Sequence, residues 1–324
     1  QARGASVCLS VVSFEQLAAM EKLSFEGRVA LVTGGGRGLG RAHCLLLAAR
    51  GAKVVVNNRT PDKADEVVAT IKAAGGTAVA NYSDIAVAGD ECVEDAVRHF
   101  GRIDIVVANA GQLKDGTFKK MELANFTALL DTHVVGHFRV LKAAWPYFMK
   151  QKYGRVVLIA SESGMHGNFG QTNYSAAKGA LIGMGQTLAM EGFKDGILTN
   201  IICTEGYTRM HNNLRPADKR MSEEDLGKQS QPAAAPVVYL CHESCKSTAN
   251  IFRVDGFGLG GTAAGHVNAY RWQSDEAFVD FDPSKGDDAL EAVASQWHEA
   301  KFETVAYRGQ AAHAYSPIGA KSKL

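Results

Sequence analysis

The chain has 324 residues, of which 46% are hydrophobic and 21% are charged, a composition typical of a folded globular protein. Its 35 basic and 34 acidic side chains give a formal net charge of +1, which argues against nucleic acid as a partner, because nucleic-acid-binding proteins carry a strongly basic surface. The sequence has no apolar stretch of the roughly 18 residues that a membrane-spanning helix needs. We therefore expect no membrane span.

The six cysteines are scattered along the chain and lack the dense spacing of a disulfide framework. Two of them lie in the segment CHESC (241–245), which has no second ligand pair at the spacing of a zinc site. The sequence therefore predicts reduced, intracellular thiols and no metal site.

The first predicted elements surround a glycine-rich turn. Residues 1–20 match no motif, so we treat them as an N-terminal extension outside the fold. An apolar run at 28–33 breaks into glycines at 34–40 and resumes at 41–50 with apolar residues at helical spacing. This order predicts a strand, a tight turn and a helix.

Strands and helices then alternate as far as residue 265. The next elements are a valine-rich strand at 53–57 and a helix at 62–74, with Pro61 in its first turn. Further strands are predicted at 77–81, 103–108, 155–160, 198–203 and 251–254, separated by helices that include 89–100. Short buried strands alternating with helices predict an α/β fold: a doubly wound parallel sheet of the Rossmann type with helices on both faces, over residues 21–265.

The alternation stops at the C-terminal side. Residues 289–302 have the pattern of one amphipathic helix with Trp297 on its apolar side, so we expect residues 266–324 to form a C-terminal helical appendage. The chain finishes with Ser322-Lys323-Leu324, which at a free C-terminus is the tripeptide that the peroxisomal import receptor reads. The motif predicts that receptor as a partner and the peroxisome matrix as the location.

The glycine-rich turn predicts a dinucleotide site, because its glycines let the backbone approach a pyrophosphate and the following helix offers unpaired N–H groups. The residues concerned are Thr33, Gly34, Arg37, Gly38, Leu39 and Gly40.

The end of the second strand is where such folds choose between NAD and NADP. Asn58 stands at the position of an acidic side chain that would bind the ribose of NAD, and Arg59 follows it. Arg59 and Arg37 together could neutralise the extra phosphate, so we expect NADP. The alternative is NAD, with two solvated arginines. Asp84 is a candidate partner of the adenine amine or an ordinary turn aspartate.

Ser161, Tyr174 and Lys178 form the candidate catalytic set. Tyr174 and Lys178 are four residues apart, so on a helix they share a face, and Ser161 follows a predicted strand. A tyrosine that works near neutral pH needs its pKa lowered by roughly 3 units from about 10. We expect the Lys178 ammonium to supply much of that shift, while Ser161 holds the oxygen of a carbonyl or an alcohol.

These residues resemble those of the short-chain dehydrogenases/reductases. The glycine turn matches the cofactor loop of that family, Asn109-Ala110-Gly111 matches its sheet-stabilising turn, and Ser161, Tyr174 and Lys178 match its catalytic residues, the last two also contacting the cofactor. A closer likeness is to the (3R)-hydroxyacyl-CoA dehydrogenase part of peroxisomal multifunctional enzymes of type 2. It rests on the runs KQKYGR (150–155), GNFGQTNYSAAK (167–178) and LCHESC (240–245).

Three departures from the family pattern stand out. His133 takes the place of the asparagine that anchors a proton-relay water, and a histidine can also hold a water there. Thr204-Glu205-Gly206 replaces the usual Pro-Gly, with Thr208 a candidate contact of the nicotinamide carboxamide. Asn58 replaces the aspartate that selects NAD in the closer branch.

The resemblance implies an enzyme that interconverts (3R)-3-hydroxyacyl-CoA and 3-ketoacyl-CoA in peroxisomal fatty-acid metabolism, and that forms a homodimer or a homotetramer. The alternatives are an NADP-dependent ketoreductase for another carbonyl substrate and a dinucleotide-binding scaffold without turnover.

Overall fold

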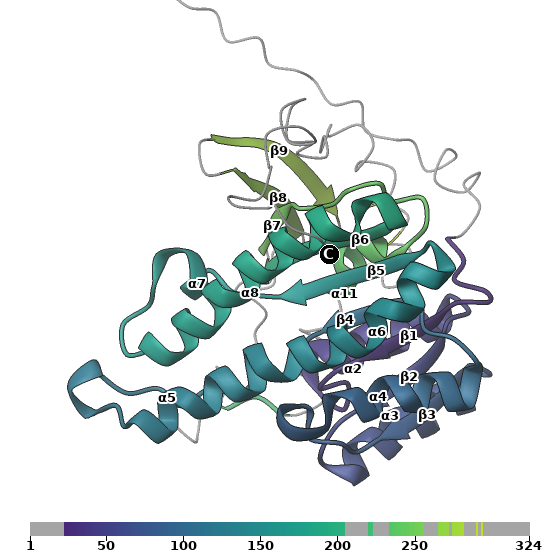
Figure 1. Ribbon diagram of the computed structural model, residues 1–324, viewed down its shortest axis with the longest axis horizontal. Helices are drawn as coiled ribbons and strands as arrows, with labels where there is room; N and C mark the ends of the chain where they lie inside the picture. Colours follow the sequence, from purple (N-terminus) through teal and green to yellow (C-terminus); the bar gives the residue numbers. More distant parts are fainter. Residues whose placement is uncertain are drawn as a thin grey trace, which may run out of the picture.

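The structure is a computed structural model that describes residues 23–204, 220–222, 233–255, 265–271 and 274–281, together with Leu290 and Val293. Its centre is a nine-stranded sheet with the strand order β3-β2-β1-β4-β5-β6-β7-β8-β9 (Figure 1). The strands are β1 (Val29–Val32), β2 (Lys53–Asn57), β3 (Thr77–Asn81), β4 (Ile105–Ala108), β5 (Gly154–Ile159), β6 (Ile197–Thr204), β7 (Ile251–Asp255), β8 (Gly265–Arg271) and β9 (Ser274–Phe281). The first seven run parallel, which confirms the predicted doubly wound sheet.

Helices cover both faces of the sheet, because alternate residues of each buried strand point to opposite faces. In β1, Ala30 and Val32 join one apolar core and Val29 and Leu31 the other. The first core is covered by α2 (Gly38–Ala49), α3 (Pro61–Ala73) and α11 (Ala234–Cys241). The second is covered by α4 (Ile85–Phe100), α6 (His137–Gln151) and α8 (Thr172–Gly192). No described helix is long and apolar enough to span a bilayer.

Shorter elements surround the second core. They are η1 (Phe118–Lys120), α5 (Leu123–Leu130), the π-helix η2 (Asp131–Gly136), α7 (Ser163–His166) and η3 (Phe193–Asp195). Together η2 and α6 continue α5 as one long helical segment along the sheet (Figure 1). From β1 the chain adds β2 and β3 on one side, and from β4 onward it adds strands on the other side, so the strand order reverses between β1 and β4. Doubly wound sheets bind their ligands at the carboxyl ends of the two strands that flank such a reversal.

The region after β7 departs from the helical appendage expected for residues 266–324. There β8 pairs antiparallel with β7, and β9 antiparallel with β8, so the chain first extends the sheet. Of the helix expected at 289–302, Leu290 and Val293 are described; both are helical and buried in the first core. Residues 1–20, Trp297 and Ser322-Lys323-Leu324 lie outside the described residues.

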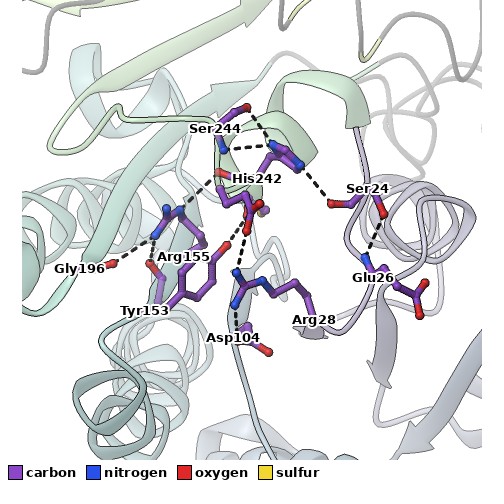
Figure 2. Close-up of polar contacts among 12 residues, drawn as sticks. Ser24, Glu26, Arg28, Asp104, Tyr153, Arg155, Gly196, His242 and Ser244 are labelled. Atoms are coloured by element: carbon purple, nitrogen blue, oxygen red, sulfur yellow. Dashed lines mark hydrogen bonds and ion pairs between the residues drawn. The ribbon is translucent and has the colours of Figure 1, made fainter. Parts of the chain in front are cut away.

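A polar cluster ties together the amino ends of the parallel strands (Figure 2). The guanidinium groups of Arg28 and Arg155 lie 3.8 and 4.3 Å from the centre of the Tyr153 ring. Arg28 donates to the buried carboxylate of Asp104 at 3.3 Å, and Arg155 donates to three backbone carbonyl groups, including that of His242. These contacts join the starts of β1, β4 and β5 to the end of α11.

Candidate active site

Two turns meet at the carboxyl ends of β1 and β4. The Thr33 hydroxyl oxygen accepts hydrogen bonds from the backbone N–H groups of Asn109 and Ala110, at 2.9 and 3.0 Å. In return the Asn109 side-chain amide donates to the carbonyl of Thr33 at 2.9 Å and to that of Gly34 at 3.3 Å. The glycine-rich turn and Asn109-Ala110-Gly111 therefore form one hydrogen-bonded unit.

The glycine-rich turn fits a dinucleotide pyrophosphate. Gly34 has a φ of +65°, and a Cβ there would lie 2.8 Å from the Cα of Ala110. A Cβ on Gly40 would lie 2.3 Å from the carbonyl oxygen of Gly34, so the backbone passes too closely for a side chain. Helix α2 begins at Gly38, with Arg37 as N-cap, no side-chain cap and no acidic residue in its first turn. Its first N–H groups are thus suited to an anion.

The residues expected to choose the coenzyme lie beside this turn. The Asn58 amide nitrogen is 2.4 Å from where a Cβ of Gly36 would be, which puts Asn58 directly against the glycine turn. Arg59 forms an exposed ion pair of 3.2 Å with Asp84. Asp84 also caps α4 by accepting from the N–H of Ala86 at 3.0 Å, so it has the role of a turn aspartate in this structure. The adenine contact stays a prediction.

Ser161, Tyr174 and Lys178 come together at the carboxyl end of β5. Ser161 follows that strand, and its hydroxyl hydrogen-bonds the Tyr174 phenol, while α8 supplies Tyr174 and Lys178. The Lys178 side chain is 3% exposed, its Nζ donates to the carbonyl of Ile159 at 2.5 Å, and the same Nζ lies 5.4 Å from the centre of the Tyr174 ring. The structure therefore places the three predicted side chains in one constellation.

The pKa values differ from the sequence expectation. Burial raises the pKa of Tyr174 to about 12, although a hydrogen bond from Ser161 works in the opposite direction. Burial also lowers the pKa of Lys178 to about 7. The sequence led us to expect that the Lys178 ammonium supplies much of a downward shift, whereas in this structure the loss of hydration dominates and the pKa of Tyr174 is raised. The group poised near neutral pH is the lysine.

His133 lies against the catalytic tyrosine. Its ring meets the Tyr174 ring edge to face, with centres 5.5 Å apart. Its Nε2 is 3.0 Å from the carbonyl oxygen and 3.1 Å from the backbone nitrogen of Gln112, whereas its buried Nδ1 has no hydrogen-bond partner. Burial, and then the Lys178 charge, hold the pKa of His133 well below its usual value. A Cβ on Gly111 would lie 2.5 Å from the ring, so the glycine makes room for it.

Gln171 and Asn173 were not among the predicted site residues, and both anchor the start of α8. Asn173 is fully buried, accepts from the backbone N–H of Tyr174 at 2.8 Å and donates to the carbonyl of Lys114 at 2.9 Å. Gln171 donates to the carboxylate of Asp115 at 3.1 Å. Both lie in the run that carries the resemblance, and polar side chains directly before a candidate catalytic residue are the signal that could have identified them.

Two further expectations concern other parts of the chain. Thr208 lies outside the described residues. In the CHESC segment, the ring of His242 contacts Ser244 and the carbonyl of Ser24, and Glu243 pairs with Arg28. Within the described ranges no three histidine, cysteine or acidic side chains are grouped to hold a metal ion, and the described cysteines are free and buried.

Several known proteins are similar to this chain in sequence, and a solved structure is similar to it in fold. The peroxisomal hydratase-dehydrogenase-epimerase of Saccharomyces cerevisiae is 40% identical over 86% of this chain and 30% of its own length. A Mycobacterium tuberculosis protein named as a short-chain type dehydrogenase/reductase is 42% identical over 85% of this chain and 94% of its own length. The solved full-length peroxisomal multifunctional enzyme type 2 of Drosophila melanogaster has 36% identity and a TM-score of 0.60, over 77% of this chain and 40% of that one.

The chain spans about a third of the length of the peroxisomal relatives that it matches. The family model described as short chain dehydrogenase matches residues 28–219, which is more than half of the chain. That range contains the glycine-rich turn, Asn109-Ala110-Gly111 and the Ser161, Tyr174 and Lys178 constellation. The protein therefore belongs to the short-chain dehydrogenase/reductase family and is an NAD(P)-dependent oxidoreductase.

Proposed function

We propose that the protein interconverts (3R)-3-hydroxyacyl-CoA and 3-ketoacyl-CoA in peroxisomal fatty-acid metabolism. The observation that carries the proposal is the Ser161, Tyr174 and Lys178 constellation beside the glycine-rich turn, in a chain 40% identical to part of a peroxisomal hydratase-dehydrogenase-epimerase. The sequence chemistry by itself gives a secondary alcohol and its ketone; the acyl-CoA identity comes from the resemblance to the dehydrogenase part of the peroxisomal multifunctional enzymes of type 2.

In this mechanism the substrate oxygen lies between Ser161 and Tyr174. The Ser161 hydroxyl donates to that oxygen and stabilises the charge that develops on it. Tyr174 takes the proton of the alcohol in one direction and returns it to the ketone oxygen in the other. The bound dinucleotide supplies hydride chemistry at the substrate carbon. Lys178 changes its protonation near pH 7, so it can pass the proton of Tyr174 toward solvent.

His133 is proposed to take part in this proton path. Its Nδ1 is buried without a hydrogen-bond partner, and its ring lies against Tyr174. An unpaired buried ring nitrogen is costly and is suited to hold a relay water. Because the pKa of His133 lies well below its usual value, the ring is neutral when it does so.

We propose NADP as the preferred coenzyme, with Arg37 and Arg59 facing its additional phosphate and Asn58 in place of an acidic side chain. The Arg59 to Asp84 pair is exposed, so a phosphate can compete for the guanidinium at little cost. NAD is the alternative. The two are distinguished by Kd values for NADH and NADPH.

Exposed phenylalanines near Tyr174 support an acyl substrate. The loop before α8 and the loop after β4 are joined by a hydrogen bond of 2.8 Å from Gly116 to Gly170. Phe169, which is 89% exposed, and Phe118, which is 80% exposed, lie beside that bond. Apolar side chains held in water at the edge of a catalytic site are suited to cover a fatty acyl chain.

A substitution tests this role of Phe169. We expect Phe169→Ser to lower kcat/KM for a C12 substrate several-fold and to leave a C4 substrate nearly unchanged. Phe193→Ser is the matched control, because Phe193 is 58% exposed at the far end of α8. An equal loss for both chain lengths would refute a contact with the acyl chain.

We further propose a homodimer or homotetramer and a peroxisomal location. Exposed apolar side chains of α6 and α8, among them Phe138, Met149 and Met190, support an interface between copies. Light scattering on a gel-filtration column measures the assembly. For the location, the names of the relatives and the Ser322-Lys323-Leu324 motif are the support, and a fluorescent fusion with and without that tripeptide is the test.

The decisive experiment for the activity measures initial rates with NAD and NADP against a (3R)- and (3S)-hydroxyacyl-CoA pair. We expect turnover of the (3R) form alone and a loss of at least a thousandfold in Tyr174→Phe. Faster turnover of acyl-carrier or steroid ketones would favour the alternative ketoreductase. A Tyr174→Phe protein as active as the wild type would favour a dinucleotide-binding scaffold.

A further inference from the structure

His137 is a fully buried histidine that the sequence analysis and the mechanism above leave without a role. It is the first residue of α6, directly after the π-helix η2 that carries His133. Its Nδ1 lies 2.8 Å from the carbonyl oxygen of His133, and its Nε2 lies 3.1 Å from the hydroxyl oxygen of Thr33. The one ring therefore touches both the π-helix and the dinucleotide turn.

The direction of each hydrogen bond follows from its partners. A carbonyl oxygen can only accept, so Nδ1 carries the proton and donates to His133. Burial lowers the pKa of His137 to about 3, so the ring is neutral and Nε2 is an acceptor. The Thr33 oxygen already accepts from Asn109 and Ala110, which leaves its proton for Nε2 at 3.1 Å or for the carbonyl of Val107 at 3.4 Å. The shorter contact is the one to His137.

The π-helix explains why a side chain is needed here. In an α-helix, the backbone N–H of residue 137 would donate to the carbonyl of residue 133. In η2 that N–H donates to Val134, and the Nδ1 of the His137 ring donates to the His133 carbonyl at 2.8 Å. Buried carbonyl groups need a partner, so the ring stabilises the irregular turn that sets His133 against Tyr174.

We propose that His137 is a positioning residue that links the dinucleotide turn to the catalytic π-helix, through Thr33 on one side and the carbonyl of His133 on the other. The proposal rests on the proposed function for its catalytic end, whereas its dinucleotide end needs the family assignment alone. His137 touches neither substrate nor cofactor; it acts through the two groups to which it bonds.

The first test compares two buried histidines. His137→Phe keeps the ring shape and removes both hydrogen bonds, so we expect the Kd for NADPH or NADH to rise about tenfold and kcat at saturation to fall about tenfold. His43→Phe is the matched control, because His43 is equally buried on α2 and neither of its ring nitrogens has a partner. We expect this control to keep both constants within twofold of the wild type.

Two smaller changes separate the ends of the link. The amide nitrogen of Asn in His137→Asn can replace Nδ1, so this variant should retain most of kcat and lose dinucleotide affinity. The amide oxygen of Gln in His137→Gln can replace Nε2, so this variant should retain affinity and lose kcat. A histidine that merely fills space would lower the melting temperature in all three variants without this split.

Wild-type Kd and kcat in His137→Phe, or equal losses in His43→Phe, would overturn the inference. Should His137→Phe not fold, the other two variants decide. The inference stands if His137→Asn loses mainly dinucleotide affinity and His137→Gln loses mainly kcat, and it falls if the two variants lose both alike. The Kd is measured by dinucleotide fluorescence without substrate, so it tests the dinucleotide end even where the wild type turns over no hydroxyacyl-CoA. A wild-type protein that binds the dinucleotide but does not turn over hydroxyacyl-CoA would refute the proposed function, and would leave the link through His137 standing.

Discussion

Lys178 and Tyr174 illustrate how burial can reverse an expectation drawn from residue types. The sequence identified both side chains and their shared helix face, and the structure brings them together with Ser161. Residue spacing alone could not predict whether the attraction between the Lys178 ammonium and the Tyr174 phenolate outweighs the loss of hydration of the two groups. That loss depends on how much of the surrounding chain excludes water from them. The resulting pKa of about 7 makes Lys178 the titrating group of the constellation.

The pH dependence should therefore have opposite signs in the two directions. Reduction of the ketone consumes a proton, so we expect its kcat to fall as Lys178 loses its proton through a pH near 7. Oxidation of the alcohol releases a proton, so its kcat should rise through the same range. Steady-state rates from pH 5 to pH 10 measure both profiles, with Lys178→Arg as a permanently charged comparison. Parallel profiles in the two directions would contradict this assignment.

Asn58 offers a second test at the scale of one residue. A carboxylate at this position would repel the additional phosphate of NADP and accept from the ribose hydroxyl groups of NAD. We expect Asn58→Asp to shift the ratio of kcat/KM for NADP over NAD toward NAD by roughly tenfold or more, which corresponds to about 1.4 kcal/mol. Asp62→Asn, in the first turn of α3, is the control for a general change of charge. An unchanged ratio in Asn58→Asp would show that Asn58 does not select the coenzyme.

At the scale of elements, the regular strands and helices followed from hydrophobic pattern. The strands at 53–57 and 77–81 have the predicted bounds, because short apolar runs bounded by turn residues leave little choice. The π-helix η2 was not predicted, since a short stretch of wider turns inside a longer helix is too brief to be recognised from apolar periodicity. Its position is set by tertiary contacts, among them those of His133 and His137.

The contact of η2 with Gly111 gives a prediction for that element. A Cβ at Gly111 would lie 2.5 Å from the His133 ring, so the ring would have to shift from its edge-to-face contact with Tyr174. We expect Gly111→Ala to lower the free energy of unfolding by about 1–3 kcal/mol and kcat by more than tenfold. Gly116→Ala is the control, because a Cβ there meets no atom within 4 Å. Urea unfolding and initial rates measure both effects, and a stable, active Gly111→Ala protein would contradict the described packing.

For the molecule as a whole, the doubly wound sheet and its cofactor edge were predictable, whereas β8 and β9 were not. The sequence after residue 265 loses the alternation of strand and helix, and an antiparallel hairpin that extends a parallel sheet gives a weaker pattern than a buried strand. Of the range 289–302, where we expected a helix, the structure describes Leu290 and Val293, which join the first core.

Buried histidines should make the whole fold sensitive to acid. Burial lowers the pKa values of His43 and His137 from 6.5 to about 3, so the unfolded chain binds protons that the native state does not. Stability is then complete above pH 6.5 and falls as the pH drops toward 3, by at most about 1.4 kcal/mol per pH unit for each histidine. Urea unfolding at pH 7.5 and pH 5 measures this slope. We expect His43→Phe to reduce it, and an unchanged slope would contradict a neutral buried His43.

The sandwich of Tyr153 between two guanidinium groups has a consequence for how this protein can diversify. It anchors the amino ends of the strands, one full strand length away from Tyr174. The contacts that stabilise the fold thus lie at the amino ends of the strands, at one rim of the sheet, and the catalytic side chains lie at the carboxyl ends, at the other rim. Loops at the reactive rim can accumulate substitutions that broaden the substrate repertoire while the opposite rim continues to secure the architecture, a partition that directed evolution can exploit.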